Sequence, residues 1–154
     1  MKKEIRKASH NELEQLKKIA RKTIDTNYRS FLGDEGVDWF INSGASDEYI
    51  NDNIDDCWLL LCENQVIGFS VCKLNLIDLM MIDTEYHRKG YGTMLIKHSE
   101  DYLFKQYNEI VLESFEGNIQ ANNFYRKNNW IEKEIKFDEA SGLNKIIFSK
   151  KPKS

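Results

Sequence analysis

Apolar residues along the chain follow two spacings, one typical of strands and one typical of helices. Uninterrupted or alternating apolar runs predict strands over residues 3–8, 58–62, 66–74, 76–83, 109–114, 130–137 and 143–149. Apolar residues at helical spacing predict helices over residues 9–24, 37–44, 46–54, 89–106 and 118–128. Strands this apolar must be covered on both faces. The order therefore predicts an α/β fold with a mixed, mostly antiparallel sheet of about six to seven strands and helices on both faces.

The ends of the predicted helices carry local signals. Ser9 and Glu12 have the spacing of a capping box and are expected to start the first helix. Gly33 and Gly36 are expected to interrupt the pattern before the second helix, and Ser46 to cap the third.

The connections between the predicted strands indicate their directions. The strands 58–62, 66–74 and 76–83 follow one another through short turns, so they are expected to form an antiparallel meander. Gly68 inside the second of them indicates a bulge or close packing. Strand 109–114 is reached through a helix, which predicts that it runs parallel to strand 76–83. The last two strands are expected to form a hairpin around Ser141 and Gly142.

The most informative stretch is residues 77–97, where an apolar strand, a loop with two glycines and a helix follow one another. Backbone N–H groups at a helix start lack intrahelical partners, and the helix dipole adds partial positive charge there. Gly90 and Gly92 would let a ligand approach that backbone without a Cβ in the way. This arrangement is suited to a phosphate.

The sequence of this loop can be compared with the known phosphate-binding loops. A third glycine is missing for the dinucleotide fingerprint, and the Gly-Lys-Ser/Thr ending of a Walker loop is absent. The run HRKGYG from His87 to Gly92 resembles instead the pyrophosphate loop of the GNAT superfamily of N-acetyltransferases, Arg/Gln-x-x-Gly-x-Gly/Ala. His87 at the first position departs from that pattern, whereas Arg88 and both glycines are in place.

A second block strengthens the resemblance. The segment from 111 to 131 has an apolar strand, a short loop, Asn-x-x-Ala, Phe-Tyr, a turn and an aromatic residue, in the order of the family's second block. These residues are Asn118, Ala121, Phe124, Tyr125 and Trp130. The family often has glycine before that aromatic residue, and asparagine at position 129 also tolerates the left-handed conformation. The resemblance covers roughly residues 59–130.

The resemblance implies where acetyl-CoA, the co-substrate, would lie. It would occupy a splay between the strand at 79–82 and the strand at 111–114. Its pantetheine arm would bond to backbone groups of Met80, Met81 and Ile82 and touch Asn118. Its pyrophosphate would lie on the amides of the loop and helix start, with two side chains adding positive charge. The residues of that loop are Arg88, Lys89, Gly90, Tyr91, Gly92 and Thr93.

Acetyl transfer to an amine requires an oxyanion donor, an acid and a base. A backbone N–H near Ile82 could polarise the thioester carbonyl. Tyr125 matches the family's general acid, which protonates the departing thiolate. Glu113 ends an apolar strand where some members carry a catalytic glutamate, and burial there would raise its pKa toward that of a base. Two alternatives stay open: a water chain to solvent, or another carboxylate such as Glu116 or one within residues 30–56.

Composition sets the broad class. The chain has 154 residues, 41% of them hydrophobic and 31% charged, which indicates one globular domain, 1–154. No apolar run is long enough to span a membrane and the first residues lack the apolar core of a secretory signal, so the cytoplasm is the expected location. Cys57, Cys62 and Cys72 show no paired spacing and are expected to be reduced and partly buried. Three scattered histidines predict no metal site.

Charge indicates the kind of partner. The net charge of −3 argues against a nucleic-acid partner. Between Ser30 and Cys72 there is no Lys or Arg but many carboxylates, including Asp34, Glu35 and Asp38. In family members this region helps to shape the acceptor site, so a cationic acceptor is expected: a polyamine, an aminoglycoside-like amine, or a peptide lysine or N-terminal amine.

Other readings of the chain stay open at the sequence level. The aromatic residues Trp39, Tyr49 and Trp58 could line an acceptor pocket, although aromatic residues at such spacing more often belong to a core. A binding module that retains an acyl-CoA without catalysis, acting as a sensor, is the main alternative to an enzyme. A nucleotide-phosphate binder on an unrelated fold is a weaker one. The C-terminal hairpin offers a free edge at which a homodimer could form.

Overall fold

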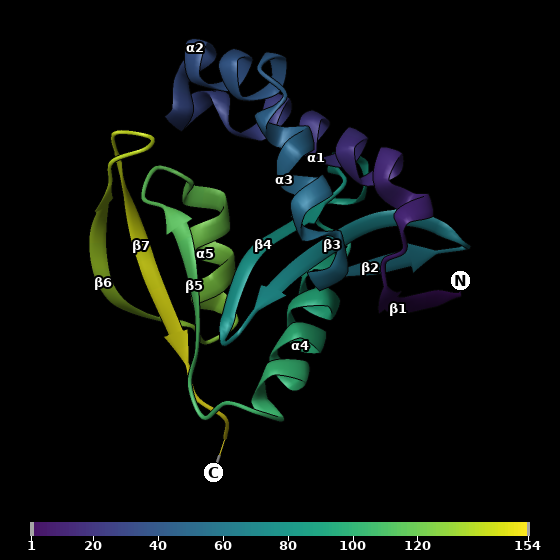
Figure 1. The fold of residues 1–154 in the computed structure, drawn as a ribbon. Coiled ribbons are helices and arrows are strands. Elements are labelled where there is room, and N and C mark those ends of the chain that lie inside the picture. Colours follow the sequence, from purple (N-terminus) through teal and green to yellow (C-terminus); the bar gives the residue numbers. More distant parts are fainter. Residues whose placement is uncertain (1, 154) are drawn as a thin grey trace.

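The computed structural model describes residues 2–153, which form a seven-stranded mixed sheet in the order β1-β2-β3-β4-β5-β7-β6 (Figure 1). The strands are β1 (Lys3–Lys7), β2 (Cys57–Cys62), β3 (Gln65–Lys73), β4 (Leu76–Ile82), β5 (Ile110–Phe115), β6 (Ile131–Asp138) and β7 (Leu143–Lys150). The helices are α1 (Leu13–Asn27), α2 (Arg29–Asn42), α3 (Ala45–Asn53), α4 (Tyr91–Phe104) and α5 (Ile119–Lys127). Short 3₁₀ turns lie at η1 (His10–Glu12), η2 (Ile54–Asp56) and η3 (Thr84–Tyr86).

Helices cover both faces of the sheet, as the apolar strands predict. On one face, α1, α2 and α3 pack through Leu16, Val37 and Ile50 onto a buried cluster that includes Leu59 and Phe69 of the sheet. On the other face, α4 packs onto two further clusters that include residues of β2, β3, β4 and β5. The expected α/β fold, with its mixed and mostly antiparallel sheet, is confirmed.

The predicted helices are all present, but three of their ends differ from expectation. Ser9 donates its backbone N–H to Glu12 Oε1 (2.9 Å), so the capping box forms, and the turn η1 precedes α1. Gly33 has a φ of +78° and kinks α2 without ending it, whereas Gly36 lies within the helix. The helix α3 begins after Gly44, which has a left-handed backbone (φ +86°), and Ser46 is buried in its first turn instead of capping it.

The parallel pair of strands in the middle of the sheet is short. Only two residues of β4 pair with β5: Leu76 with Val111, and Ile77 with Leu112. Beyond Ile77, β4 continues to Ile82 with β3 alone as its partner. In Figure 1 the two strands diverge from this point, and the sheet opens between them. The predicted splay therefore begins immediately after Ile77 and Leu112.

Gly68 is a site of close packing and lies next to a bulge, as predicted. The β2–β3 register shifts between Leu60 and Leu61. A Cβ on Gly68 would lie 2.6 Å from Ile82 Cδ1 and 2.9 Å from the carbonyl oxygen of Met81. Only glycine lets β3 approach the end of β4 this closely.

The C-terminal hairpin has one unpaired edge. The strand β7 lies between β5 and β6, which leaves β6 at the end of the sheet. Three of its large apolar side chains are exposed: Ile131, Ile135 and Phe137. The cysteines are all buried and unbridged, as expected, and burial raises the pKa of Cys57 to about 12. Within residues 2–153, no helix has the length and apolar character needed to cross a membrane.

Candidate active site

The open edge of β4 presents its backbone groups to the splay. Asp83 donates its N–H to the carbonyl of Ile67 on β3 (2.8 Å), so residues 83, 81 and 79 form the hydrogen-bonded pairs with β3. Because successive residues of a strand direct their backbone groups to opposite sides, the N–H and C=O groups of Met80 and Ile82 point away from β3, into the splay. Met81, by contrast, directs its backbone toward β3. Of the three predicted residues, Met80 and Ile82 therefore present backbone groups to the splay, and a contact of Met81 with a ligand stays a prediction.

His87 holds the end of β4. Its Nε2 lies 2.6 Å from the carbonyl oxygen of Ile82, which must accept, so that ring nitrogen carries the proton. This bond uses the Ile82 carbonyl and leaves the Ile82 N–H as the group directed into the splay. The departure from the family pattern at position 87 thus has a structural role in fixing the turn between β4 and α4.

The loop after β4 ends at an exposed helix start. Arg88 and Gly90 both have left-handed backbones (φ +63° and +85°), and Gly90 is the N-cap of α4. The first backbone N–H groups of α4 have no intrahelical acceptor. The side chain of Tyr91 turns inward, with its hydroxyl 3.7 Å from Cys62 Sγ, so at this position only the backbone faces a ligand. Arg88 and Lys89 are exposed beside it.

Gly92 brings the two helices on this face together. A Cβ at this position would lie 3.3 Å from the ring of Phe124 on α5. A larger residue would therefore push α5 away from the start of α4. Thr93 is half-buried in the same turn. The predicted loop residues from position 88 to 93 thus surround one helix start beside the end of β4.

The helix α5 borders the other side of the splay. Asn118 is its N-cap and accepts a bond from the N–H of Ala121 (3.4 Å). Asn122, which sequence reasoning missed, is buried and donates to the carbonyls of Phe115 and Glu116 (3.1 Å each). These bonds fix the turn from β5 into α5. Its position four residues after Asn118 was the only signal in the sequence.

Tyr125 lies on the α4–α5 face of the sheet. Its ring packs on Phe124 and on Phe148, with ring centroids 5.6 Å apart in each case. Burial, with a smaller contribution from Tyr28, raises the pKa of its hydroxyl above the usual value. The hydroxyl therefore stays protonated at neutral pH and is able to donate a proton.

Glu113 lies on the opposite face. Its neighbours Leu112 and Ser114 are buried on the α4–α5 side, so alternation along β5 directs Glu113 toward α1–α3. Phe115, two residues further, shares that face and contacts Phe31 of α2 with ring centroids 5.5 Å apart. Glu113 is exposed, so the expected burial of this carboxylate is wrong. The predicted acid and base thus flank the splay from opposite sides.

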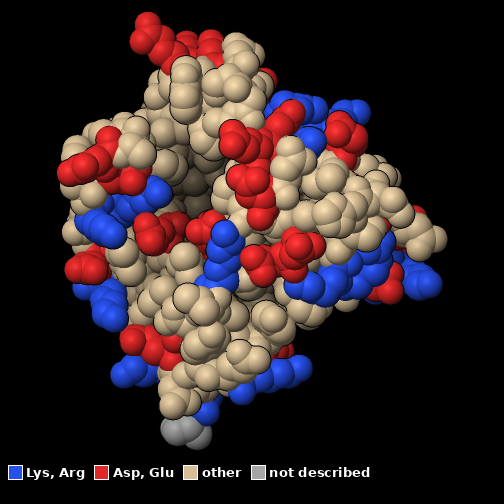
Figure 2. All heavy atoms as spheres, viewed as in Figure 1, with Lys and Arg blue, Asp and Glu red and all other residues tan. Residues whose placement is uncertain are grey.

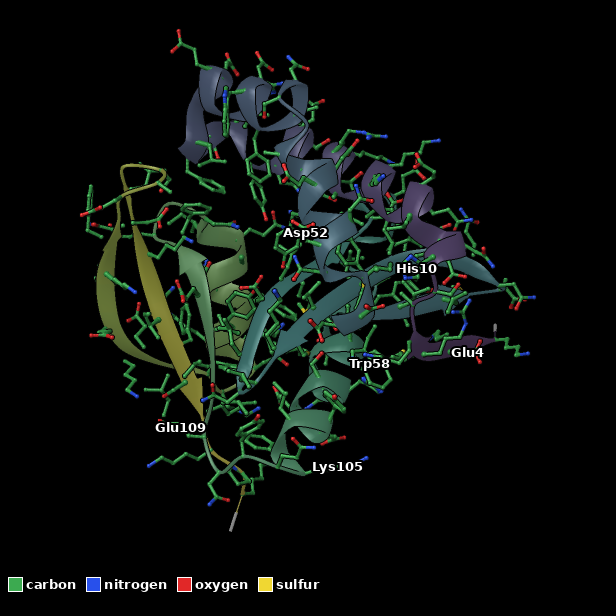
Figure 3. All side chains as sticks on the ribbon, viewed as in Figure 1. Glu4, His10, Asp52, Trp58, Lys105 and Glu109 are labelled. Carbon is green, nitrogen blue, oxygen red and sulfur yellow. The ribbon has the colours of Figure 1, made fainter. Side chains whose placement is uncertain are left out.

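The surface is hollowed on the α1–α3 side of the splay. Figure 2 shows this hollow beneath α2, with acidic side chains along its right-hand and lower rims and basic ones on its left. Asp52 of α3 lies at the edge of this opening in Figure 3, whereas Glu109 lies at the far end of β5. Of the three candidate aromatic residues, Tyr49 bonds to Asp78 of β4. Trp58 packs on α4, and Trp39 is 64% exposed.

The acidic carboxylates of α2 have a cationic partner that precedes them. Arg29 pairs with Asp25, Asp34 (3.1 Å) and Asp38 (2.8 Å). These bonds raise the pKa of the guanidinium above its usual value. Because one arginine serves three carboxylates, this end of α2 keeps a negative charge. Asp34 and Asp38 are nevertheless held by Arg29.

An opened parallel strand pair beside a glycine-lined helix start defines a site for an extended ligand with a phosphate at one end. Comparison with known proteins agrees with this class. A model described as the acetyltransferase (GNAT) family matches residues 19–130. The chain belongs to this family and is an acetyl-CoA-dependent N-acetyltransferase. No curated protein sequence matches it significantly.

Solved structures share the whole fold. A Thermoplasma acidophilum PaiA N-acetyltransferase, solved with coenzyme A, is 24% identical with a TM-score of 0.80, over 99% of this chain and 100% of that one. A GCN5-related N-acetyltransferase from Rhodopseudomonas palustris is 13% identical with a TM-score of 0.85, over 99% and 97%. A ribosomal-protein alanine N-acetyltransferase from Escherichia coli is 17% identical with a TM-score of 0.72, over 96% and 92%.

Metal ligands do not gather in the described part of the chain. Within residues 2–153, no group of three or more His, Cys, Asp or Glu side chains is placed to hold a metal ion.

Proposed function

We propose that the protein transfers the acetyl group of acetyl-CoA to a cationic primary amine by direct attack in a ternary complex. The observation that carries this proposal is the pair of side chains on the two faces of the splay. A carboxylate, Glu113, is exposed on the α1–α3 face of the sheet, and a protonated phenol, Tyr125, lies on the α4–α5 face. An amine arriving from one face would thus meet a base, and a thiolate leaving toward the other would meet an acid.

Acetyl-CoA would bind along β4. The backbone N–H and C=O of Met80 that face the splay would pair with the amides of its pantetheine arm, as a neighbouring strand would, and the Ile82 N–H would remain for the thioester carbonyl. The pyrophosphate would bind the N–H groups at the start of α4, where Arg88 and Lys89 add positive charge. Asn118 would contact the arm from the start of α5.

The transfer would proceed through a tetrahedral intermediate. The amine enters as an ammonium ion, and Glu113 takes its proton, directly or through water. The free nitrogen attacks the thioester carbon and forms the C–N bond, while the Ile82 N–H binds the oxyanion. Collapse of the intermediate breaks the C–S bond, and the Tyr125 hydroxyl gives its proton to the leaving thiolate. The acylated nitrogen loses its second proton, which passes through water to the Tyr125 phenolate, and Glu113 releases its proton to solvent.

Replacing Tyr125 by phenylalanine tests the acid. Tyr125→Phe keeps the ring packed on Phe148 but removes the proton, so kcat for acetyl transfer should fall about 100-fold or more. The dissociation constant for acetyl-CoA should change less than about twofold, because the hydroxyl acts only as the thiolate leaves. Free-thiol release against a panel of amines gives the first quantity, and titration calorimetry the second.

The matched control is Tyr107→Phe. Tyr107 is another partly buried tyrosine of the same apolar cluster, but it lies after the end of α4, away from the splay. Its replacement should leave both constants unchanged. Equal losses of kcat in the two variants would mean that a tyrosine hydroxyl in this cluster serves stability rather than proton transfer, and the acid role would be withdrawn.

A further inference from the structure

A carboxylate follows the last paired residue on each of the two strands where the sheet opens. The last paired positions of β4 and β5 are Ile77 and Leu112. The next residue on each strand is acidic, Asp78 on β4 and Glu113 on β5, and both are exposed. Paired parallel strands lie about 4.8 Å apart, and the two strands begin to diverge after this last pair. The two side chains therefore begin at adjacent positions, one residue beyond the last pair.

Both carboxylates lie on the α1–α3 face of the sheet, from which the acceptor would enter. Asp78 occupies the bulge where the β3–β4 register shifts, and it accepts a hydrogen bond from the Tyr49 hydroxyl of α3. Because α3 packs on the α1–α3 face, this bond fixes the side of the sheet on which Asp78 lies. Glu113 reaches the same side through the alternation of β5. The hollow seen in Figure 2 opens on this face.

Tyr49 holds the Asp78 side chain in place. Burial is the main cause that raises the pKa of the Tyr49 phenol, and its bond to Asp78 raises it further. The phenol thus remains a hydrogen-bond donor to Asp78 throughout the neutral range. Within the described residues, neither Asp78 nor Glu113 forms an ion pair with Lys, Arg or His.

Aromatic rings border the same space. Phe31 of α2 stacks at a tilt on Tyr28 and on Phe115, with centroids 5.1 and 5.5 Å apart. The Tyr28 phenol has a pKa raised by burial to about 12, and it lies close enough to raise those of Tyr49 and Tyr125 as well. Apolar and aromatic walls suit the methylene chain of an alkylamine.

We propose that Asp78, positioned by Tyr49, binds a second ammonium group of the acceptor while Glu113 receives the proton of the first. The acceptor class is then an aliphatic diamine or polyamine, whose two charges match the two adjacent carboxylates. This inference rests on the proposed function. It assigns acceptor selectivity to a residue outside the acidic carboxylates of α2, since Asp34 and Asp38 are already paired with Arg29.

Selectivity between a diamine and its matched monoamine tests the proposal. The wild-type protein should acetylate 1,4-diaminobutane with kcat/KM at least about tenfold above that for 1-aminobutane, because the monoamine lacks the second charge. In Asp78→Asn this ratio should fall about tenfold, mainly through KM for the diamine. Tyr49→Phe should lower the ratio less, since the carboxylate remains but loses its positioning bond. Asp101→Asn, an exposed carboxylate on α4, is the control and should not alter the ratio.

The outcomes separate this inference from the proposed function. A diamine preference that disappears in Asp78→Asn and persists in Asp101→Asn supports it. Equal turnover of diamine and monoamine, or of an N-terminal peptide amine and the diamine, overturns the inference while the acetyltransferase proposal stands. A diamine preference that Asp78→Asn leaves unchanged also overturns the inference. Turnover of none of these amines by a wild-type protein that binds acetyl-CoA overturns the proposed amine acceptor and, with it, the inference.

Discussion

At the scale of single residues, the ends of β3 and β4 depend on one glycine. Gly68 faces Ile82, whose backbone N–H is the proposed oxyanion donor, and no Cβ fits between the two strands. The sequence indicated close packing here because glycine in a strand is otherwise unfavourable. What it could not indicate was the partner, because that depends on the register of β3 against β4.

The substitution Gly68→Ala should destabilise the fold. The added Cβ would meet Ile82 and the Met81 carbonyl at 2.6 and 2.9 Å, so the free energy of unfolding should fall by about 1–3 kcal/mol. Urea denaturation measures this change. Gly36→Ala is the control, because its Cβ would have only Leu32 Cβ nearby, at 3.7 Å, within helix α2. It should be neutral or stabilising by up to about 1 kcal/mol. Equal effects of the two would mean that β3 and β4 can separate freely here.

Asp78 and Tyr49 show what single-residue reading cannot find. Nothing in the pattern separates Asp78 from the many exposed carboxylates of this chain. Its place next to Glu113 follows from a bulge in β4 and from a two-residue parallel pairing, neither of which has a local signature. Glu113 and Tyr125 could be proposed as site residues from the sequence because they lie within motifs. The exposure of Glu113 could not be predicted from the sequence, because it depends on how far β4 and β5 diverge.

At the scale of elements, α4 is tied to the C-terminal strand by a buried ion pair. Glu100 of α4 is 6% exposed and accepts from Lys150 Nζ (2.8 Å) and from Trp130 Nε1 (3.0 Å). Lys150 also donates to the carbonyl of Asn128 (2.9 Å). These bonds connect α4, whose start is the proposed pyrophosphate site, to β7 and to the end of α5.

Removing one partner of this ion pair should lower the free energy of unfolding substantially. Lys150→Met leaves Glu100 buried without its cation, so the free energy of unfolding should fall by about 3–5 kcal/mol. The double variant Glu100→Gln with Lys150→Met should recover part of that loss, since no unpaired charge remains. Glu132→Gln, which breaks a pair with Arg126 that is about half exposed, should cost less than about 1 kcal/mol. Thermal and urea unfolding distinguish these cases, and a loss below 1 kcal/mol for Lys150→Met would contradict the argument.

The elements themselves were the most predictable part of the chain. Apolar spacing located every strand and helix, because burial on one face leaves a period that survives in the sequence. Sheet order was less accessible: the position of β7 between β5 and β6 depends on pairing across the chain. The start of α3 was misplaced because Gly44, with its left-handed backbone, begins the helix where a serine cap was expected.

At the scale of the whole molecule, the sheet is divided into two halves that meet only at the base of the splay. The β1–β4 half carries α1–α3 on one face, and the β5–β7 half lies beside α5 (Figure 1). The region from 30 to 72, without Lys or Arg, lies mainly in the first half and covers the acceptor side. A cationic acceptor that approaches past this region would therefore meet a negative field in addition to Asp78.

This field predicts that the rate depends on salt. Raising ionic strength from about 0.05 to 0.5 M shortens the screening length from roughly 14 to 4 Å. It should lower kcat/KM for 1,4-diaminobutane about fivefold or more, and that for 1-aminobutane clearly less, because the field acts on each charge. Steady-state thiol release at constant pH measures both.

Neutralising Asp34, Glu35 and Asp38 together should flatten the salt dependence and raise KM moderately, with kcat retained, because these residues lie outside the reacting groups. Salt dependences that are equal for the two amines, or that the triple variant leaves unaltered, would mean that α2 does not contribute to acceptor binding and that selectivity lies in the splay alone.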